Sequence, residues 1–329
     1  MLSMDFRSIF MGILFSVIWS SAFTSARILM TSAPPFLVLS LRFLISGILG
    51  IAIARLLGQN FNLSRQEWAG VLIFGFCQNV LNLGLNFVAL QWIDASMAVI
   101  IASMLPIVVA AISWIYLVEK PGIIGVLGLV AGMSGVLLIM IDRTGDQTKL
   151  LGLLLCSVAL LALAGATILL GNFFRSSKNL LMIVGLQMFV GFILLLPLTI
   201  MFEKWLINWS MIFIISFVYQ ILMPGVLGTL IWFLLVKRIG ATKSAAFHFL
   251  NPFFGVLIAA AILAEPISLK DGIAVVIIMS GIQLSNVALI EYAVAIDPPV
   301  VNTAIPSHVE EIINGIFDDL KKENPPNPQ

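Results

Sequence analysis

The chain has 329 residues, of which 60% are hydrophobic and 10% are charged, and its formal net charge is +1. Soluble domains carry about 25% charged residues, so this composition excludes an ordinary soluble protein. The near-zero net charge gives no indication of a nucleic-acid partner, and we expect none. The two cysteines, Cys77 and Cys156, lie in apolar segments, and we predict no disulfide framework, metal site or cofactor.

Apolar runs of about 20 residues, the length that crosses a bilayer as a helix, follow one another along the chain. We expect ten transmembrane helices, at 9–30, 34–57, 68–92, 94–118, 121–141, 149–171, 180–202, 209–236, 242–264 and 268–292. The first run is too long for a signal peptide and more spans follow it, so we interpret it as a membrane helix. The predicted fold class is all-α integral membrane.

Lysine and arginine residues concentrate in alternate loops between the expected spans. With a cytoplasmic N-terminus, the basic loop that holds Lys237, Arg238 and Lys243 lies inside, whereas Lys204 and Lys270 lie outside. Cytoplasmic loops carry the excess of positive charge in membrane proteins. The sequence therefore predicts a multi-pass protein of the plasma membrane with both termini in the cytoplasm.

The second half of the sequence resembles the first. A shift of 146 residues without gaps aligns Pro106 with Pro252 and Glu119 with Glu265. Each unit contains five expected spans, and an odd number reverses the orientation of the second unit in the membrane. Two inverted five-helix repeats are typical of secondary transporters, which bind their substrates near mid-membrane at the repeat interface.

The predicted organisation has three parts. The first repeat covers 1–141, the second covers 149–292, and a cytoplasmic tail covers 293–329. Within the tail, Ser307 and Glu310 have the spacing of a capping box and precede a short amphipathic helix. We expect the tail to be dispensable for transport because the repeat pair is complete without it.

Several short motifs accompany the repeats. They are a Trp-Ser-Ser stretch at 19–21, a Leu-Arg-Phe stretch at 41–43, and the terminal Glu119 and Glu265 of spans four and nine. Together with the five-plus-five spans, they resemble the drug/metabolite transporter superfamily, EamA-like branch, from residue 9 to about 290. The resemblance implies a carrier that exports or exchanges amino acids or other small metabolites by alternating access.

Six side chains are candidates for a substrate-binding site, namely Arg42, Trp19, Asn79, Asn82, Asn86 and His248. Arg42 lies inside a span, and no acidic residue of any span is placed to neutralise it. A charge within the membrane is costly and indicates function by default, although a long side chain can also extend to the membrane surface. We predict that Arg42 meets an anionic group of the substrate.

The three asparagines have the spacing i, i+3 and i+7, which predicts one polar face on the third span. Such a face can line a substrate path or form hydrogen bonds between helices. Trp19 is the expected aromatic contact in the first span. His248 is the imidazole within a span and can titrate near neutral pH, or it can simply bond to a neighbour such as Asn251.

Two further functional interpretations remain open at this stage. A Gly-x-Ser-Gly stretch at 132–135 would make Ser134 the nucleophile of an intramembrane enzyme, although we expect no enzyme because the second repeat lacks the first glycine. A channel or scaffold protein is the other alternative. The expected partners are a small-molecule substrate and the lipid bilayer, and the sequence leaves a homodimer open. Glu119 and Glu265 are expected to cap the next helix or pair with Lys120 or Lys270, and proton coupling is the alternative role for them.

Overall fold

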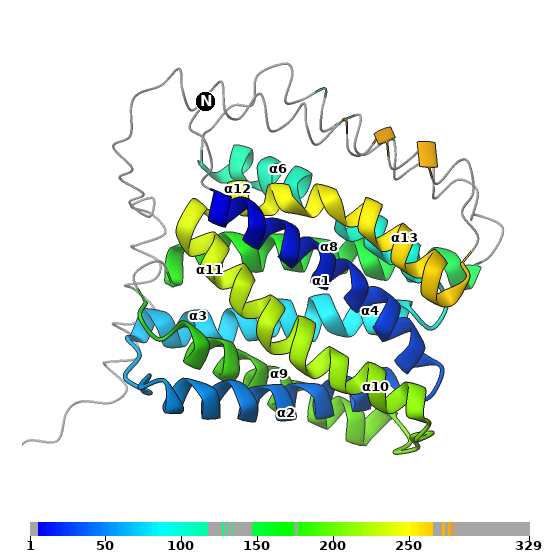
Figure 1. Ribbon diagram of the computed structural model, residues 1–329, viewed down its shortest axis with the longest axis horizontal. Coiled ribbons are helices and arrows are strands. Elements are labelled where there is room, and N and C mark those ends of the chain that lie inside the picture. The colour runs from blue at the N-terminus through cyan, green and yellow to red at the C-terminus, as the bar shows by residue number, and fades with distance from the viewer. Residues whose placement is uncertain are drawn as a thin grey trace, which may run out of the picture. The chain divides into compact units, whose positions relative to one another are not determined.

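The structure is a computed structural model that describes residues 6–117, 147–174 and 177–265, with isolated helical positions between 127 and 134 and between 272 and 280. All regular elements in these ranges are helices (Figure 1). Most of the expected fifth and tenth spans, and the whole tail at 293–329, lie outside the described residues.

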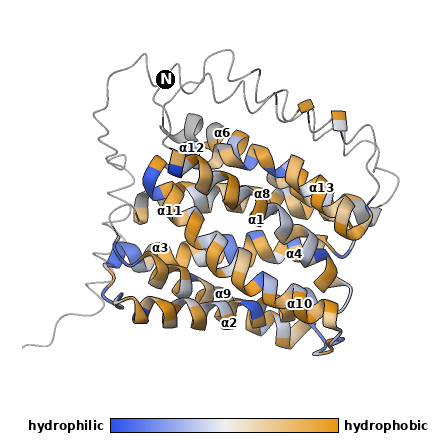
Figure 2. Cartoon of the chain, in the orientation of Figure 1, coloured by the Kyte–Doolittle hydropathy of each residue, from blue (hydrophilic) through white to orange (hydrophobic). Residues whose placement is uncertain are grey.

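Seven helical segments of the described ranges are long and apolar enough to cross a bilayer. They are Phe6–Met30, Pro35–Leu56, Arg65–Ala89, Leu150–Leu170, Leu180–Phe202, Met211–Ile239 and Lys243–Leu263. A shorter apolar helix, Ala95–Val109, occupies the expected fourth span. Figure 2 shows apolar residues along the helices and polar residues gathered mainly near their ends. This part of the chain therefore has the helix lengths and composition of a multi-pass membrane protein.

Four expected spans are single helices. They are α1 (Phe6–Met30), α2 (Pro35–Leu56), α8 (Gln147–Phe173) and α9 (Leu180–Phe202). Pro35 is the first residue of α2, where the missing N–H of proline costs no hydrogen bond. These boundaries agree with the expected spans to within a few residues because the spans end where polar residues begin.

The third and eighth spans each contain a central π-helical segment. The third span consists of α3 (Arg65–Phe74), η1 (Gly75–Leu83) and α4 (Gly84–Ala89), and the eighth consists of α10 (Met211–Gln220), η2 (Ile221–Gly228) and α11 (Thr229–Ile239). The segments η1 and η2 begin 146 residues apart, which is the shift found in the sequence. π-Helical turns are rare and occur often at functional sites.

The fourth and ninth spans are broken. The fourth consists of α5 (Ala95–Ala102) and α6 (Leu105–Leu117), and the ninth consists of α12 (Ala241–Ala245), the 3₁₀ segment η3 (Ala246–Leu250) and α13 (Asn251–Leu263). Pro106 and Pro252 follow the breaks directly. Proline removes a backbone donor and clashes with the preceding turn, so regular hydrogen bonding stops at these points.

Helices α2 and α9 lie side by side (Figure 1) and cross at a close distance. A Cβ atom placed on Gly50 would lie 3.0 Å from Gly185 Cα, and one placed on Gly185 would lie 2.7 Å from the backbone nitrogen of Ile51. Only glycine fits such an approach, and small residues are the usual means by which membrane helices pack closely.

The remaining packing follows a reciprocal pattern. In the first half (residues 6–117), α1 packs against α13 and against all three segments of the eighth span. In the second half (residues 147–265), α8 packs against α5, α6 and all three segments of the third span. Helix α5 also packs against α13. The first helix of each half therefore contacts the third and fourth spans of the other half.

Two carboxylates of the second half cap the N-termini of helices in the first half. Glu203 accepts hydrogen bonds from the backbone N–H groups of Phe36, at 2.9 Å, and Leu37, at 2.7 Å, in the first turn of α2. Carboxylates are stabilised at helix N-termini because the N–H groups there lack helical partners. Burial nevertheless raises the pKa of the Glu203 carboxyl above its usual range, although the two N–H groups oppose this effect.

Glu265 makes the second of these contacts. It accepts from the backbone N–H groups of Ala95, at 2.8 Å, and Ser96, at 3.1 Å, and from the Ser96 hydroxyl, at 2.6 Å. Glu265 therefore caps α5 of the other half, whereas the start of the helix expected after its own span lies outside the described residues. Glu119, Lys120 and Lys270 lie outside the described residues.

A neutral side chain of the first half caps the N-terminus of a helix in the second half. The side-chain oxygen of Gln59, which follows α2, accepts from the backbone N–H of Met182 in the first turn of α9, at 3.0 Å. Met182 is 146 residues after Phe36, so the two caps occupy matching positions in the two halves. Each half thus supplies caps to the other.

Candidate substrate-binding site

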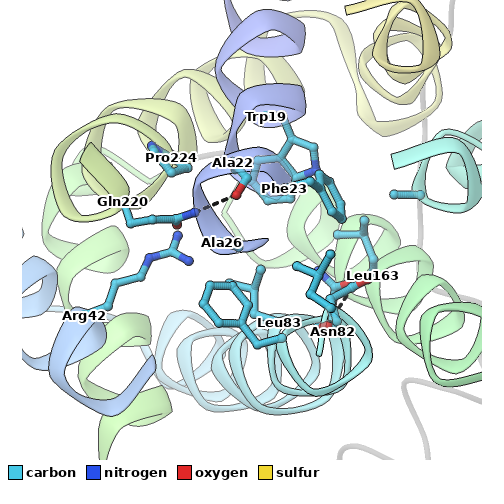
Figure 3. Close-up of a pocket in the computed structure, with 14 residues that line it drawn as sticks. Trp19, Ala22, Phe23, Ala26, Arg42, Asn82, Leu83, Leu163, Gln220 and Pro224 are labelled. Carbon is cyan, nitrogen blue, oxygen red and sulfur yellow. Dashed lines mark hydrogen bonds between the residues drawn. The ribbon is translucent and has the colours of Figure 1, made fainter. Parts of the chain in front are cut away.

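A cavity lies between the two halves. It is bounded by α1, α2, the third and eighth spans, α5 and α8 (Figure 3). Most of its wall is apolar and includes Phe23, Leu83, Phe87 and Leu163. A largely apolar cavity with a few polar groups has the lining that is typical of a small-molecule site.

Arg42, the eighth residue of α2, points into this cavity (Figure 3). Its side chain is only 2% exposed, and its Nε has no hydrogen-bond partner among the residues that the structure describes. The guanidinium carbon lies 5.6 Å from the Phe43 ring and 6.0 Å from the Phe87 ring. Aromatic faces attract a cation, but no described carboxylate forms an ion pair with Arg42. A buried positive charge therefore faces the cavity with no opposite charge beside it in the part of the chain that the structure describes.

Amide side chains on the third span form a ladder along one wall. Asn86 Nδ2 donates to Asn82 Oδ1 at 3.0 Å and to the Asn82 carbonyl at 2.8 Å, and Asn82 Nδ2 donates to Gln78 Oε1 at 3.3 Å. Asn82 and Asn86 both line the cavity. Because each amide binds the next, the ladder holds its members in fixed orientations.

Asn79 lies on a different side of the same span. Its Nδ2 donates to the Gln187 carbonyl at 2.7 Å and to Gln187 Oε1 at 2.6 Å, which ties η1 to α9. The side chain is 1% exposed and does not line the cavity. The three asparagines therefore do not share one face. The prediction assumed α-helical periodicity, whereas η1 has wider π-helical turns.

Trp19 lines the cavity from α1, and His248 lies behind it. The two rings are 6.1 Å apart in an edge contact, and Phe15 and Trp232 also surround the imidazole. His248 Nδ1 lies 2.9 Å from Asn251 Nδ2 and forms a hydrogen bond with it. A bond to Asn251 was the alternative to a titrating role for His248 in the prediction from the sequence. His248 does not line the cavity, so it can influence a ligand only through Trp19.

Gln220 is a polar residue of the cavity that the sequence analysis did not identify. It is the last residue of α10 and is fully buried. Its Nε2 donates to the Ala22 carbonyl at 2.6 Å and to Ser25 Oγ at 2.8 Å. Under the 146-residue shift Gln220 falls opposite Phe74, so the repeat gave no indication of it. A lone amide inside an apolar span was the available signal.

The described residues contain no group of three or more metal-ligating side chains. The polar groups of the cavity are hydrogen-bond donors and acceptors around one cation. Such an arrangement can bind and orient a small polar molecule. Apart from Ser134, the serine motif at 132–135 lies outside the described residues.

The sequence profile of the EamA-like transporter family matches the chain twice, at residues 6–141 and 150–287. The chain belongs to this family. As an EamA-like transporter, it functions in transport across a membrane, in agreement with the resemblance seen in its motifs. The multi-pass helical architecture agrees with this membership.

Similar proteins carry transporter names. The chain is 26% identical over 271 residues to the uncharacterized transporter YvbV of Bacillus subtilis, covering 82% of this chain and 88% of that protein. It is 22% identical to YoaV, another uncharacterized transporter of Bacillus subtilis, over 82% of this chain and 94% of that one. An uncharacterized transporter of Synechocystis is 25% identical, with 82% and 86% covered.

A solved crystal structure shares the fold of this EamA-like transporter. The two superpose with a TM-score of 0.65 at 20% sequence identity, covering 85% of this chain and 98% of the other. This likeness concerns the arrangement of the helices alone.

Proposed function

We propose that this EamA-like transporter is a secondary carrier that exports or exchanges a small anionic or zwitterionic metabolite, such as an amino acid, by alternating access. The observation that carries this proposal is the cavity-facing charge of Arg42, which has no carboxylate partner among the described residues. An unpaired buried charge is costly, and a substrate anion would relieve that cost when bound. Trp19, Asn82 and Asn86 would contact the rest of the substrate.

An inverted-repeat architecture of ten helices supports alternating access. Three observations favour it: the family profile matches twice, the π-helical segments begin 146 residues apart, and the halves pack reciprocally. In such transporters the substrate lies at the interface of the repeats, and the repeats move against each other to expose it on either side. The cavity lies between the two halves, as this mechanism requires.

The direct test of carrier function is counterflow in proteoliposomes. Vesicles loaded with unlabelled amino acid or organic acid should accumulate labelled substrate transiently. The reason is that the carrier exchanges an unlabelled molecule from inside for a labelled molecule from outside in each cycle. Initial rates should also saturate with concentration. Flux that rises linearly and shows no counterflow would identify a channel instead.

The proposed orientation places both termini in the cytoplasm of a plasma-membrane protein. Lys243 in α12 and Lys204 after α9 are both exposed and, by the positive-inside pattern, lie on opposite sides. In a variant with Cys77 and Cys156 replaced by serine, Lys204→Cys should react with an impermeant maleimide in intact cells, whereas Lys243→Cys should react only after permeabilisation. Labelling of Lys243→Cys in intact cells would contradict the orientation.

A further inference from the structure

The Gln220 amide has a defined orientation. An amide nitrogen and oxygen can be interchanged when their partners are ambiguous, but the Ala22 carbonyl can only accept a hydrogen bond. The group 2.6 Å from it must therefore be the donor Nε2. Gln220 Oε1 is consequently the end of the amide that is buried without a hydrogen-bond partner within the described ranges.

Gln220 lines the same cavity as Arg42. Figure 3 shows the Gln220 side chain reaching toward α1, with the Arg42 guanidinium group pointing toward it from α2. A buried acceptor without a partner is costly, as is the unpaired Nε of Arg42. One wall of the cavity thus presents a cationic donor beside a neutral acceptor, and among the described residues neither Arg42 Nε nor Gln220 Oε1 has a hydrogen-bond partner.

We infer that Gln220 is a specificity-determining residue, whose Oε1 accepts a hydrogen bond from a donor that the substrate carries next to its anionic group. The inference rests on the proposed binding of an anion at Arg42. A carboxylate with a hydroxyl or ammonium group on the neighbouring carbon provides both features, so the substrate class is 2-hydroxy or 2-amino acids. A simple carboxylate would satisfy Arg42 but leave Gln220 Oε1 unpaired.

A positioning role and a substrate-binding role for Gln220 predict different effects of its replacement. If Gln220 only holds Arg42 in place, its loss weakens the binding of every anion equally. If Oε1 contacts the substrate, its loss removes only the preference for molecules with the neighbouring donor. Sites that bond to a substrate hydroxyl or amine reject analogues without that group because the polar groups of the site are then left unpaired.

The experiment compares molecules that differ only at the carbon beside the carboxylate. Two series are used, lactate, alanine and propionate, and the bulkier phenyllactate, phenylalanine and phenylpropionate, because the cavity wall is largely apolar. Binding to the purified full chain is measured as the ligand-dependent shift in thermal stability, and flux is measured in proteoliposomes. Wild type should bind the hydroxy or amino acid at least about tenfold more tightly than the simple acid.

In Gln220→Leu this preference should fall to about threefold or less, while affinity for the simple acid stays within about twofold of wild type. Gln220→Met provides a second, unbranched replacement if the leucine variant does not fold. The control is Gln187→Leu, which removes another buried amide that does not line the cavity and should leave the preference unchanged.

Three outcomes would overturn the inference while sparing the proposed function. The first is an unchanged preference in both Gln220 variants. The second is an equal loss for all members of a series, which would make Gln220 a positioning residue for Arg42. The third is a wild-type protein that binds simple acids as tightly as their hydroxy and amino counterparts. If no carboxylate in either series binds to wild type, the proposed anion site itself is wrong.

Discussion

Replacing Arg42 with glutamine should lower the transport of anionic or zwitterionic substrates by about 10- to 100-fold. The reason is that hydrogen bonds to charged groups contribute about 1.5–3 kcal/mol, and the cavity holds no other described cation that could replace Arg42. Arg42→Lys should retain part of the activity, because lysine keeps the charge but lacks the planar set of donors. Initial rates in proteoliposomes with equal amounts of protein measure both effects.

Arg42→Gln should lower transport without lowering the stability of the protein. Without ligand, Arg42 is a buried charge with no ion pair among the described residues, so its removal should leave the melting temperature unchanged or raise it. Arg55→Gln, at an exposed position near the end of the same helix, should alter neither property. Wild-type kinetics of Arg42→Gln for every substrate found would show that Arg42 is outside the site.

The second large effect is expected from Asn82, the middle member of the amide ladder. Asn82→Leu leaves Gln78 Oε1 and Asn86 Nδ2 without their side-chain partners. Unpaired buried polar groups cost about 1–3 kcal/mol each, and the cavity wall also loses a polar contact. We therefore expect transport by the folded protein to fall by about tenfold or more.

Asn79→Leu is the matched comparison, because it removes the same side chain three residues earlier in η1. Asn79 bonds to Gln187 of α9 and does not line the cavity, so its loss should lower thermal stability and leave the rate per folded molecule nearly unchanged. Melting curves in detergent and uptake normalised to folded protein separate the two effects. Equal losses of transport in both variants would contradict this division of the asparagines.

The positions of the membrane helices could be predicted from the sequence because their signal is a simple property of length and hydropathy. The boundaries of α9 are those expected, at 180–202. Interruptions within the spans were harder to predict from the sequence. Pro106 and Pro252 indicated the breaks in the fourth and ninth spans, but η1 contains no proline, and nothing in its composition distinguishes a π-helical turn from an α-helical one.

The candidate site was predicted in part. Trp19, Arg42, Asn82 and Asn86 lie together in the cavity, and each was singled out because polar or aromatic groups in apolar spans are unusual. Which face of a helix a residue occupies depends on the helix type, so Asn79 could not be placed without knowing that η1 is π-helical. The position of Gln220 opposite these residues follows from the packing of α10 on α1, which only the three-dimensional structure contains.

The helix caps between the halves have a consequence for the synthesis of the protein. Phe36 and Glu203 are 167 residues apart, and Ala95 and Glu265 are 170 apart. At about 5–20 residues per second, the ribosome adds Glu203 and Glu265 roughly 8–35 s after the helix starts that they cap. During this interval α2 and α5 must find other partners, such as water at the membrane surface, for their first N–H groups. The first half therefore reaches its final hydrogen bonding only after Glu265 has been synthesised, and the insertion of its first helices into the membrane precedes completion of the fold.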